Sequence, residues 1–188
     1  REFISTKTIG GNAVNLDLDY RLHKNWKGGL TLFTASGNEP ESDGKQFWED
    51  DSQAYLEVQS GDFGDALIYF NGREGLGQGH SVSNLTFYAL RASYISDKKN
   101  VSFSLAAYSF SRTEPVFYNA VGEEEKKSHD IGRELDFTVD WNLEEKLRVG
   151  LQLALFNPGP AYSPNDNVRP TGEPKGFSFI GAQLTYQF

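Results

Sequence analysis

The 188-residue sequence contains no cysteine, and it has no run of the roughly 18 to 20 consecutive apolar residues that a membrane-spanning helix requires. The absence of cysteine excludes a disulfide framework and a thiolate metal site. The absence of long apolar runs means that the chain can cross a bilayer only as part of a closed β-barrel, whose strands hide their polar side chains on the inner face.

Positive charge is also scarce, because 18 Lys and Arg stand against 26 Asp and Glu, a formal net charge of −8. We expect no nucleic-acid partner, since neutralising phosphates requires clustered basic side chains. The hydrophobic share of 38% lies below the roughly 45–50% that is usual for soluble domains. The first residues do not resemble a secretory leader, and the chain begins at Arg1 rather than Met, so we expect a processed or truncated product.

The sequence is instead rich in aromatic residues and glycine, with 14 Phe, 9 Tyr, 3 Trp and 19 Gly, which is typical of strands and turns. The clearest strand is Ile131 to Trp141, where apolar side chains alternate with acidic or polar ones. Alternation over about ten residues predicts a strand that can cross hydrocarbon at a tilt. Six further segments show a similar pattern: Val14 to Leu22, Gly29 to Ser36, Val82 to Ile95, Val101 to Ala107, Leu147 to Leu155 and Ile180 to Phe188.

The connections between these strands alternate between short turns and long polar stretches rich in glycine, proline and acidic residues. Short turns at one rim and long loops at the other are typical of outer-membrane proteins. We therefore predict an all-β fold, an antiparallel transmembrane β-barrel, with residues 1–188 forming one barrel domain. The expected extracellular loops are at about 37–81, 112–129 and 157–175.

The number of strands bears on how much of the barrel this chain contains. Seven strands are clear, and a hairpin of 53–59 with 65–71 would make nine. Either number is odd, whereas single-chain bacterial barrels have an even number, so we expect further strands upstream of this chain.

Aromatic residues mark the short-turn ends of the expected strands. Such residues form a girdle at the membrane interface, here made of Tyr20, Trp26, Tyr94, Trp141, Tyr186 and Phe188. The last strand ends on Leu184, Tyr186 and Phe188, which we interpret as the signal that the barrel-assembly machinery recognises. The other expected partners are outer-membrane lipid and lipopolysaccharide, and a periplasmic partner protein stays open.

Several short segments carry a resemblance to a known family when they are taken in order. One strand ends in Tyr20-Arg21-Leu22, and the next leads through Thr34-Ala35-Ser36-Gly37 into a long loop; the pattern resumes at Ser83-Asn84-Leu85 and again at Gly132-Arg133-Glu134-Leu135-Asp136. These segments resemble the C-terminal half of the alginate-export outer-membrane β-barrel family. The resemblance implies a monomeric barrel of about 18 strands, located in the outer membrane, that conducts an anionic polysaccharide through a charged lumen.

The polar positions of the alternating strands predict the residues of the inner face. These are Asp17, Asp19, Arg21, Arg91, Glu134, Asp136, Asp140, Arg148 and Gln152. They either line the conduction path or form cross-strand ion pairs that brace the wall, and the two roles can coexist. Because carboxylates outnumber arginines in this set, we expect an anionic polymer to be repelled unless the rest of the barrel is strongly basic.

Other features of the sequence point to no chemistry. The histidines His23, His80 and His129 fall in turns or loops without a partner at metal-ligand spacing, so we expect no metal, no cofactor and no enzyme activity. The acidic clusters at 39–43, 49–51 and 123–125 lack the spacing of a calcium loop, and the glycines of 72–79 lack the setting of a phosphate loop.

Three functional classes stay open at this point. The first is a channel for a polar or charged solute or polysaccharide, which the barrel pattern favours. The second is a barrel that serves as a sleeve for a partner protein, such as an electron-transfer conduit. The third is a soluble β-sandwich binding protein, in which the face bearing Leu135, Phe137 and Val139 would be buried within the monomer.

Overall fold

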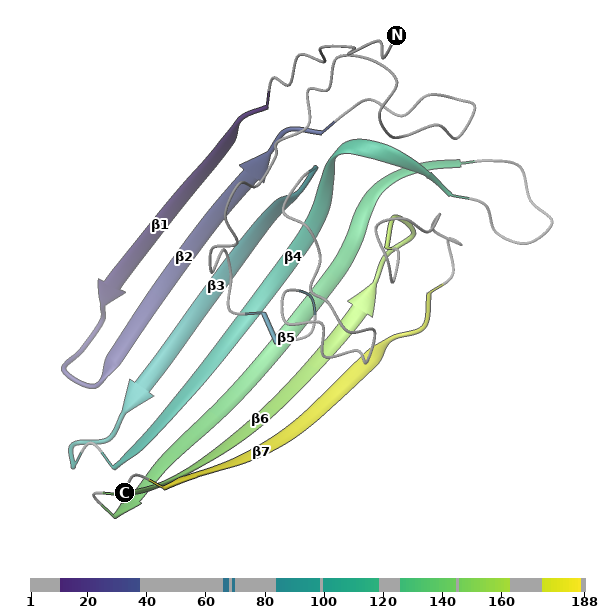
Figure 1. Cartoon of the computed structure of the whole chain (residues 1–188). Helices are drawn as coiled ribbons and strands as arrows, with labels where there is room; N and C mark the ends of the chain where they lie inside the picture. The colour runs from purple at the N-terminus through teal and green to yellow at the C-terminus, as the bar shows by residue number, and fades with distance from the viewer. Residues whose placement is uncertain are drawn as a thin grey trace, which may run out of the picture.

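A computed structural model of the chain describes residues 11–37, 66, 67, 69, 84–98, 100–118, 126–144, 146–162 and 174–186. Seven antiparallel strands make up most of this part of the chain (Figure 1). They are β1 (Ala13–Arg21), β2 (Trp26–Ala35), β3 (Thr86–Ile95), β4 (Val101–Tyr118), β5 (Lys126–Glu144), β6 (Leu147–Pro158) and β7 (Phe177–Tyr186). The expected all-β, antiparallel fold class is confirmed. None of the described residues belongs to a helix long and apolar enough to cross a membrane.

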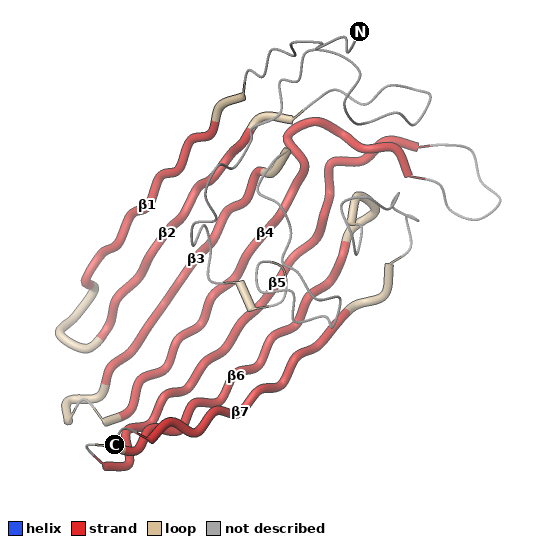
Figure 2. The backbone as a smooth tube through the Cα atoms, viewed as in Figure 1, coloured by secondary structure: helices blue, strands red, loops and turns tan. Residues whose placement is uncertain are grey.

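Each strand pairs with its neighbours in the sequence, so the order across the sheet is β1 to β7. Figure 2 shows the strands as one curved sheet. Within the described residues, β1 and β7 are the sheet edges, and each pairs on one side only. These strands form a single sheet, so no second sheet covers the apolar face as the sandwich alternative requires.

The connection expected at 112–129 is shorter than the sequence pattern suggests. Strand β4 continues to Tyr118, and β5 begins at Lys126. The two strands remain paired on the loop side of the register shifts near Phe110 and Ser111. A bulge shifts the alternation of side chains and bends the strands, so the inward and outward pattern on which the prediction relied does not continue past it. The possible hairpin at 53–59 and 65–71 falls almost wholly outside the described residues, as do the acidic clusters, the glycine-rich stretch 72–79 and Phe188.

Register across the sheet allows the strand tilt to be derived. Tyr20 on β1 lies in the same cross-strand row as Ile180 on β7. The girdle aromatic of β7, Tyr186, lies six residues further along, and six strand pairings separate β1 from β7. The girdle therefore shifts by about one residue per strand. With a rise of about 3.3 Å per residue and a strand spacing of about 4.8 Å, this shift corresponds to a tilt of about 35°, as in outer-membrane barrels.

The outward face carries an uncovered apolar band. Leu90 and Leu155 keep 65% and 59% of their surface exposed although both lie mid-strand. On β2, β3, β5 and β7 the girdle aromatic and the border residue lie eight residues apart, with three outward residues between them. Eight residues cover roughly 26 Å of strand, or about 22 Å along the membrane normal at this tilt, close to the roughly 25 Å band of outer-membrane barrels. The polar border consists of Thr34, Thr86, Ser109, Arg133, Asn157 and Ser178.

Val139 provides a test of this face assignment, because it lies inside the apolar band of β5, between Phe137 and Trp141. Val139 is one outward position from the girdle residue Trp141, so we expect Val139→Arg to cost about 1–2 kcal/mol, between the values for a cation at the interface and at the bilayer midplane, and to impair insertion. The measurement is the folded fraction during urea titration of the protein in lipid vesicles. Thr138→Arg, one residue away on the opposite face, is the control and should insert. Normal assembly of Val139→Arg would mean that the two faces are inverted.

Candidate functional site

Register places all nine sequence-predicted inner-face residues on one face of the sheet. They occupy successive rows from the loop side toward the short turns, with Asp17 and Glu134 in one row and Asp19, Arg91 and Asp136 in the next. Further rows hold Arg21 and Gln152, then Asp140, then Arg148. The nine residues therefore share one face, as the period-two pattern predicts, and their place along a conduction path stays a prediction.

Toward the loop side, the same face is filled by aromatic rings that the sequence patterns did not identify. Phe33 and Phe87 stack with ring centroids 5.3 Å apart, and Phe156 contacts Tyr162 at 5.2 Å. Phe110 joins the same buried cluster. In these parts of β2, β3 and β4, both faces carry apolar side chains, so strict alternation is lost. The sequence signal that could have located this aromatic cluster is the loss of alternation near the loop ends of the strands.

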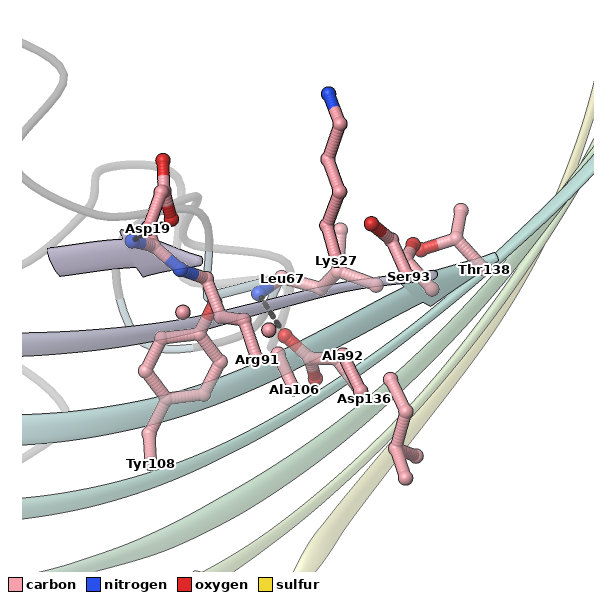
Figure 3. A pocket seen from close by; sticks show the side chains of 14 residues that line it. Asp19, Lys27, Leu67, Arg91, Ala92, Ser93, Ala106, Tyr108, Asp136 and Thr138 are labelled. Carbon is pink, nitrogen blue, oxygen red and sulfur yellow. Dashed lines mark hydrogen bonds and ion pairs between the residues drawn. The ribbon is translucent and has the colours of Figure 1, made fainter. Parts of the chain in front are cut away.

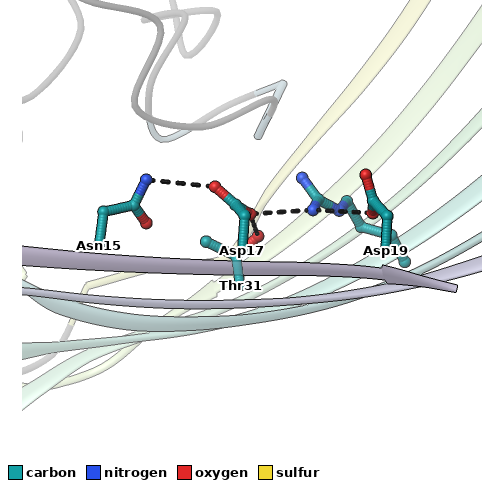
Figure 4. A network of polar contacts seen from close by, with 5 residues as sticks. Asn15, Asp17, Asp19 and Thr31 are labelled. Carbon is teal, nitrogen blue, oxygen red and sulfur yellow. Dashed lines mark hydrogen bonds and ion pairs between the residues drawn. The ribbon is translucent and has the colours of Figure 1, made fainter.

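An ion-pair network links β1 to β3 across the intervening strand (Figure 4). The Arg91 Nη2 atom lies 3.0 Å from Asp17 Oδ1 and 3.5 Å from Asp19 Oδ1. Asp17 also accepts hydrogen bonds from Thr31 Oγ1 at 2.5 Å and from Asn15 Nδ2 at 3.1 Å. One residue on β2, one on β3 and one along β1 therefore hold the two carboxylates in place.

A glycine makes this long-range contact possible. Gly29 is the register partner of both Asp19 and Arg91, and it lies between them on β2. A Cβ atom at Gly29 would lie 2.6 Å from Asp19 Oδ1 and 3.1 Å from Arg91 Nε. A side chain at this position would therefore displace the charged groups.

A second ion pair lies nearer the short turns and follows the same design. Arg148 on β6 places its Nη2 2.8 Å and its Nε 3.1 Å from Asp140 Oδ1 on β5. The register partner of Asp140 is Gly150, where a Cβ atom would lie 3.2 Å from that same oxygen. Cross-strand ion pairs, the bracing role considered from the sequence, therefore engage Asp17, Asp19, Arg91, Asp140 and Arg148.

Glu134 and Asp136 lie on the inner face but are covered, with only 2% and 4% of their surfaces exposed. The backbone N–H of Leu67 donates to Asp136 Oδ2, and that of Tyr69 donates to Glu134 Oε2, both at 2.9 Å. Leu67 and Tyr69 belong to the connection between β2 and β3, which the sequence predicted as an extracellular loop. At these residues the connection lies against the inner face of the sheet instead.

Arg21 and Lys27 are the charged residues that remain in the described rows from Asp17 to Arg148. They are direct register partners on β1 and β2, both are exposed, and within the described part of the chain neither forms an ion pair. Lys27 was not among the sequence-predicted residues. Like charges directly opposite each other are unfavourable, so this pair does not serve to brace the wall.

A cavity of about 300 Å³ adjoins Lys27 on the inner face. Lys27, Arg91, Asp19 and Asp136 bring charged groups to its lining, and Leu67 lines it beside Asp136 (Figure 3). Hydroxyl groups of Ser93, Ser104 and Thr138 complete its polar lining. In the part of the chain that the structure describes, no three His, Asp or Glu residues are grouped to hold a metal ion. The cavity therefore offers a cation and hydroxyl groups to a polar solute.

At the short-turn rim, a polar clasp joins the β1–β2 turn to the β3–β4 turn. Lys24 Nζ lies 2.9 Å from Asp97 Oδ1, and Asn25 Nδ2 donates to the same oxygen at 2.8 Å. These contacts lower the pKa of Asp97 below its ordinary value, chiefly through the hydrogen bond from Lys24 and then that from Asn25. All three groups are in the turns, outside the strands.

The clasp predicts a pH-dependent stability. Because the pKa of Asp97 is lower in the folded state, its stabilisation is fully present above the ordinary aspartate pKa of about 3.9 and is lost as the pH falls through the lowered value. Wild type should therefore melt at a higher temperature than Asp97→Asn at pH 7, and the difference should shrink only below about pH 4. Thermal melts of the detergent-folded protein measure this, and a difference that grows on acidification would contradict the assignment.

The β1–β3 network predicts unequal effects for two arginines on the same face. Arg91→Ala leaves Asp17 and Asp19 without their shared cation, and we expect it to cost about 1 kcal/mol, because the partly exposed carboxylates are screened by solvent. Arg21→Ala, which removes an unpaired arginine, should be within about 0.5 kcal/mol of wild type. Unfolding titrations in urea compare the two. Equal destabilisation by both substitutions would show that the network does not brace the wall.

Comparison with known proteins connects this geometry to a family. The family model for alginate export matches residues 2–171, a range that includes strands β1 to β6 and the whole β1–β3 network. A comparison with curated proteins found no match. The match covers most of the chain, and it agrees with the antiparallel sheet, the tilt and the apolar outward band. The chain therefore belongs to the alginate-export family, whose members are transport proteins of the bacterial outer membrane.

Proposed function

We propose that this chain forms part of the wall of an outer-membrane channel that passes a negatively charged polar solute, with an anionic polysaccharide as the preferred class. The observation that carries the proposal is the charge that remains available on the inner face. Arg21 and Lys27 are exposed there without an ion pair, whereas the five carboxylates of the same face are engaged.

The engagement of the carboxylates changes the expectation of repulsion drawn from the sequence. Asp17 and Asp19 share Arg91, and Asp140 pairs with Arg148. The Asp140–Arg148 pair therefore has no net charge, and Asp17, Asp19 and Arg91 together carry one negative charge instead of two. Counting acidic residues in the sequence thus overstates the negative field of this wall.

The neighbourhood of Lys27 suits a hydroxylated anion. Its register row continues through Ser93, Ser104 and Thr138 to Gln152, so a cationic pair is followed by a track of neutral polar groups. A polymer of acidic sugars presents carboxylates and hydroxyl groups at short intervals. Cations attract the former, and hydroxyl or amide side chains exchange hydrogen bonds with the latter.

Ion selectivity in planar bilayers tests the proposal. Under a salt gradient, the reversal potential should indicate a preference for anions, and the double variant Arg21→Gln with Lys27→Gln should move it toward the cation side. Lys24→Gln removes a positive charge from the turn instead of the inner face and should leave the potential unchanged. A channel with an intrinsic cation preference would contradict the anionic substrate. The absence of any conductance would favour the sleeve, in which a partner protein fills the barrel.

A further inference from the structure

We propose that residues 66, 67 and 69, here called the inward segment, narrow the channel and shield two carboxylates of its wall, so that their docking sets the ion selectivity. The proposal rests on the function proposed above, since it concerns selectivity of the same conduction path. It assigns Glu134 and Asp136 a positioning role: they anchor a part of the wall instead of contacting the solute.

The spacing of the hydrogen bonds supports a built docking site. Glu134 and Asp136 are two residues apart on β5, so their side chains leave the same face of the strand about 7 Å apart. Leu67 and Tyr69 lie in a turn and are likewise two residues apart, and their N–H groups reach these two carboxylates. The order is reversed, with Leu67 on Asp136 and Tyr69 on Glu134. The inward segment thus runs antiparallel to β5.

Apolar and aromatic packing also holds the inward segment in place. Tyr69 stacks on Phe110 with ring centroids 4.3 Å apart and lies 6.2 Å from Phe156, and only 1% of its surface is exposed. Ala66 and Leu67 are buried as well. Aromatic stacking at these distances adds to the burial of apolar area. Two charge-assisted hydrogen bonds and an aromatic anchor therefore fix the segment against the wall.

The electrostatic consequence follows from what the inward segment covers. With the segment docked, Glu134 and Asp136 are almost completely shielded from solvent and accept hydrogen bonds from its backbone. With the segment displaced, two adjacent carboxylates would face the lumen, Asp136 in the row of Arg91 and Glu134 in the next row toward the loops. Rings of carboxylates favour cations. Docking therefore makes this wall narrower and also less negative.

Docking can be measured without any conduction, because the chain has no native cysteine. Leu67 and Ala106 line the same cavity, and Ala106 is the register partner of Asp136. We expect the pair Leu67→Cys with Ala106→Cys to be joined by a short bis-thiol reagent in the assembled protein. The control pair is Leu67→Cys with Ser102→Cys, four residues away on the same face of β4, and it should not be joined. Failure of the first pair, or equal reaction of both, overturns docking.

Measurements of conductance and ion selectivity then distinguish a segment that shields carboxylates from one that only obstructs the channel. Tyr69→Ala should raise the single-channel conductance and shift the reversal potential toward cations, because it releases the segment and exposes both carboxylates. Glu134→Ala with Asp136→Ala should also raise the conductance, but without the cation shift, because the segment loses both acceptors and no carboxylate is left to expose. Tyr162→Ala removes a buried aromatic ring from the same cluster without releasing the segment, and it should leave the selectivity unchanged.

The outcomes distinguish failure of this inference from failure of the proposed function. If the wild type conducts but Tyr69→Ala changes neither conductance nor selectivity, the inward segment has no role in the channel and the inference is overturned. The same holds if the double alanine variant shifts toward cations as strongly as Tyr69→Ala. If the cysteine pair is joined but the protein never conducts, docking is real, while the channel function and its selectivity role both fail.

Discussion

The constraint on which this structure depends is that every backbone N–H and C=O group within hydrocarbon must find a partner inside the protein. An antiparallel ladder satisfies that requirement, and its side chains then alternate strictly between lipid and interior. The seven strands follow this rule over the band between the aromatic girdle and the polar border. The tilt of about 35° follows from the same ladder, because register shift and strand spacing together determine it.

Charge on the inner face is organised by residues that are themselves uncharged. Gly29 and Gly150 lie opposite carboxylates of the ion pairs, and in each case a Cβ atom would crowd the charged atoms. Glycine in a strand is ordinarily a weakness, because it adds no packing and costs backbone entropy. Here it creates room for ion pairs that join two or three strands, and this is consistent with a wall that stays rigid while enclosing polar space.

The functional proposal depends on which charged side chains of the inner face are exposed without an ion pair, and not on how many charged residues the face contains. The inner face looks acidic in composition, yet its carboxylates are paired or covered, and the exposed cations Arg21 and Lys27 are left to act on a solute. The inward segment extends this principle, because it hides charge with backbone N–H groups instead of with a cation. Membership of the alginate-export family agrees with a wall that admits anions.

The sequence by itself determined the fold class, the approximate places of the seven strands and the shared face of the nine predicted residues, because period-two alternation is a local property that each strand carries independently. It also indicated the family through short segments in order. It could not show that Asp17 meets Arg91 or that Leu67 and Tyr69 cover Asp136 and Glu134, since those contacts join residues about 65 to 74 positions apart. Only the tertiary structure decided which charges are neutralised and which remain exposed, because that depends on the register between strands and on the path of a connection that carries no periodic signal.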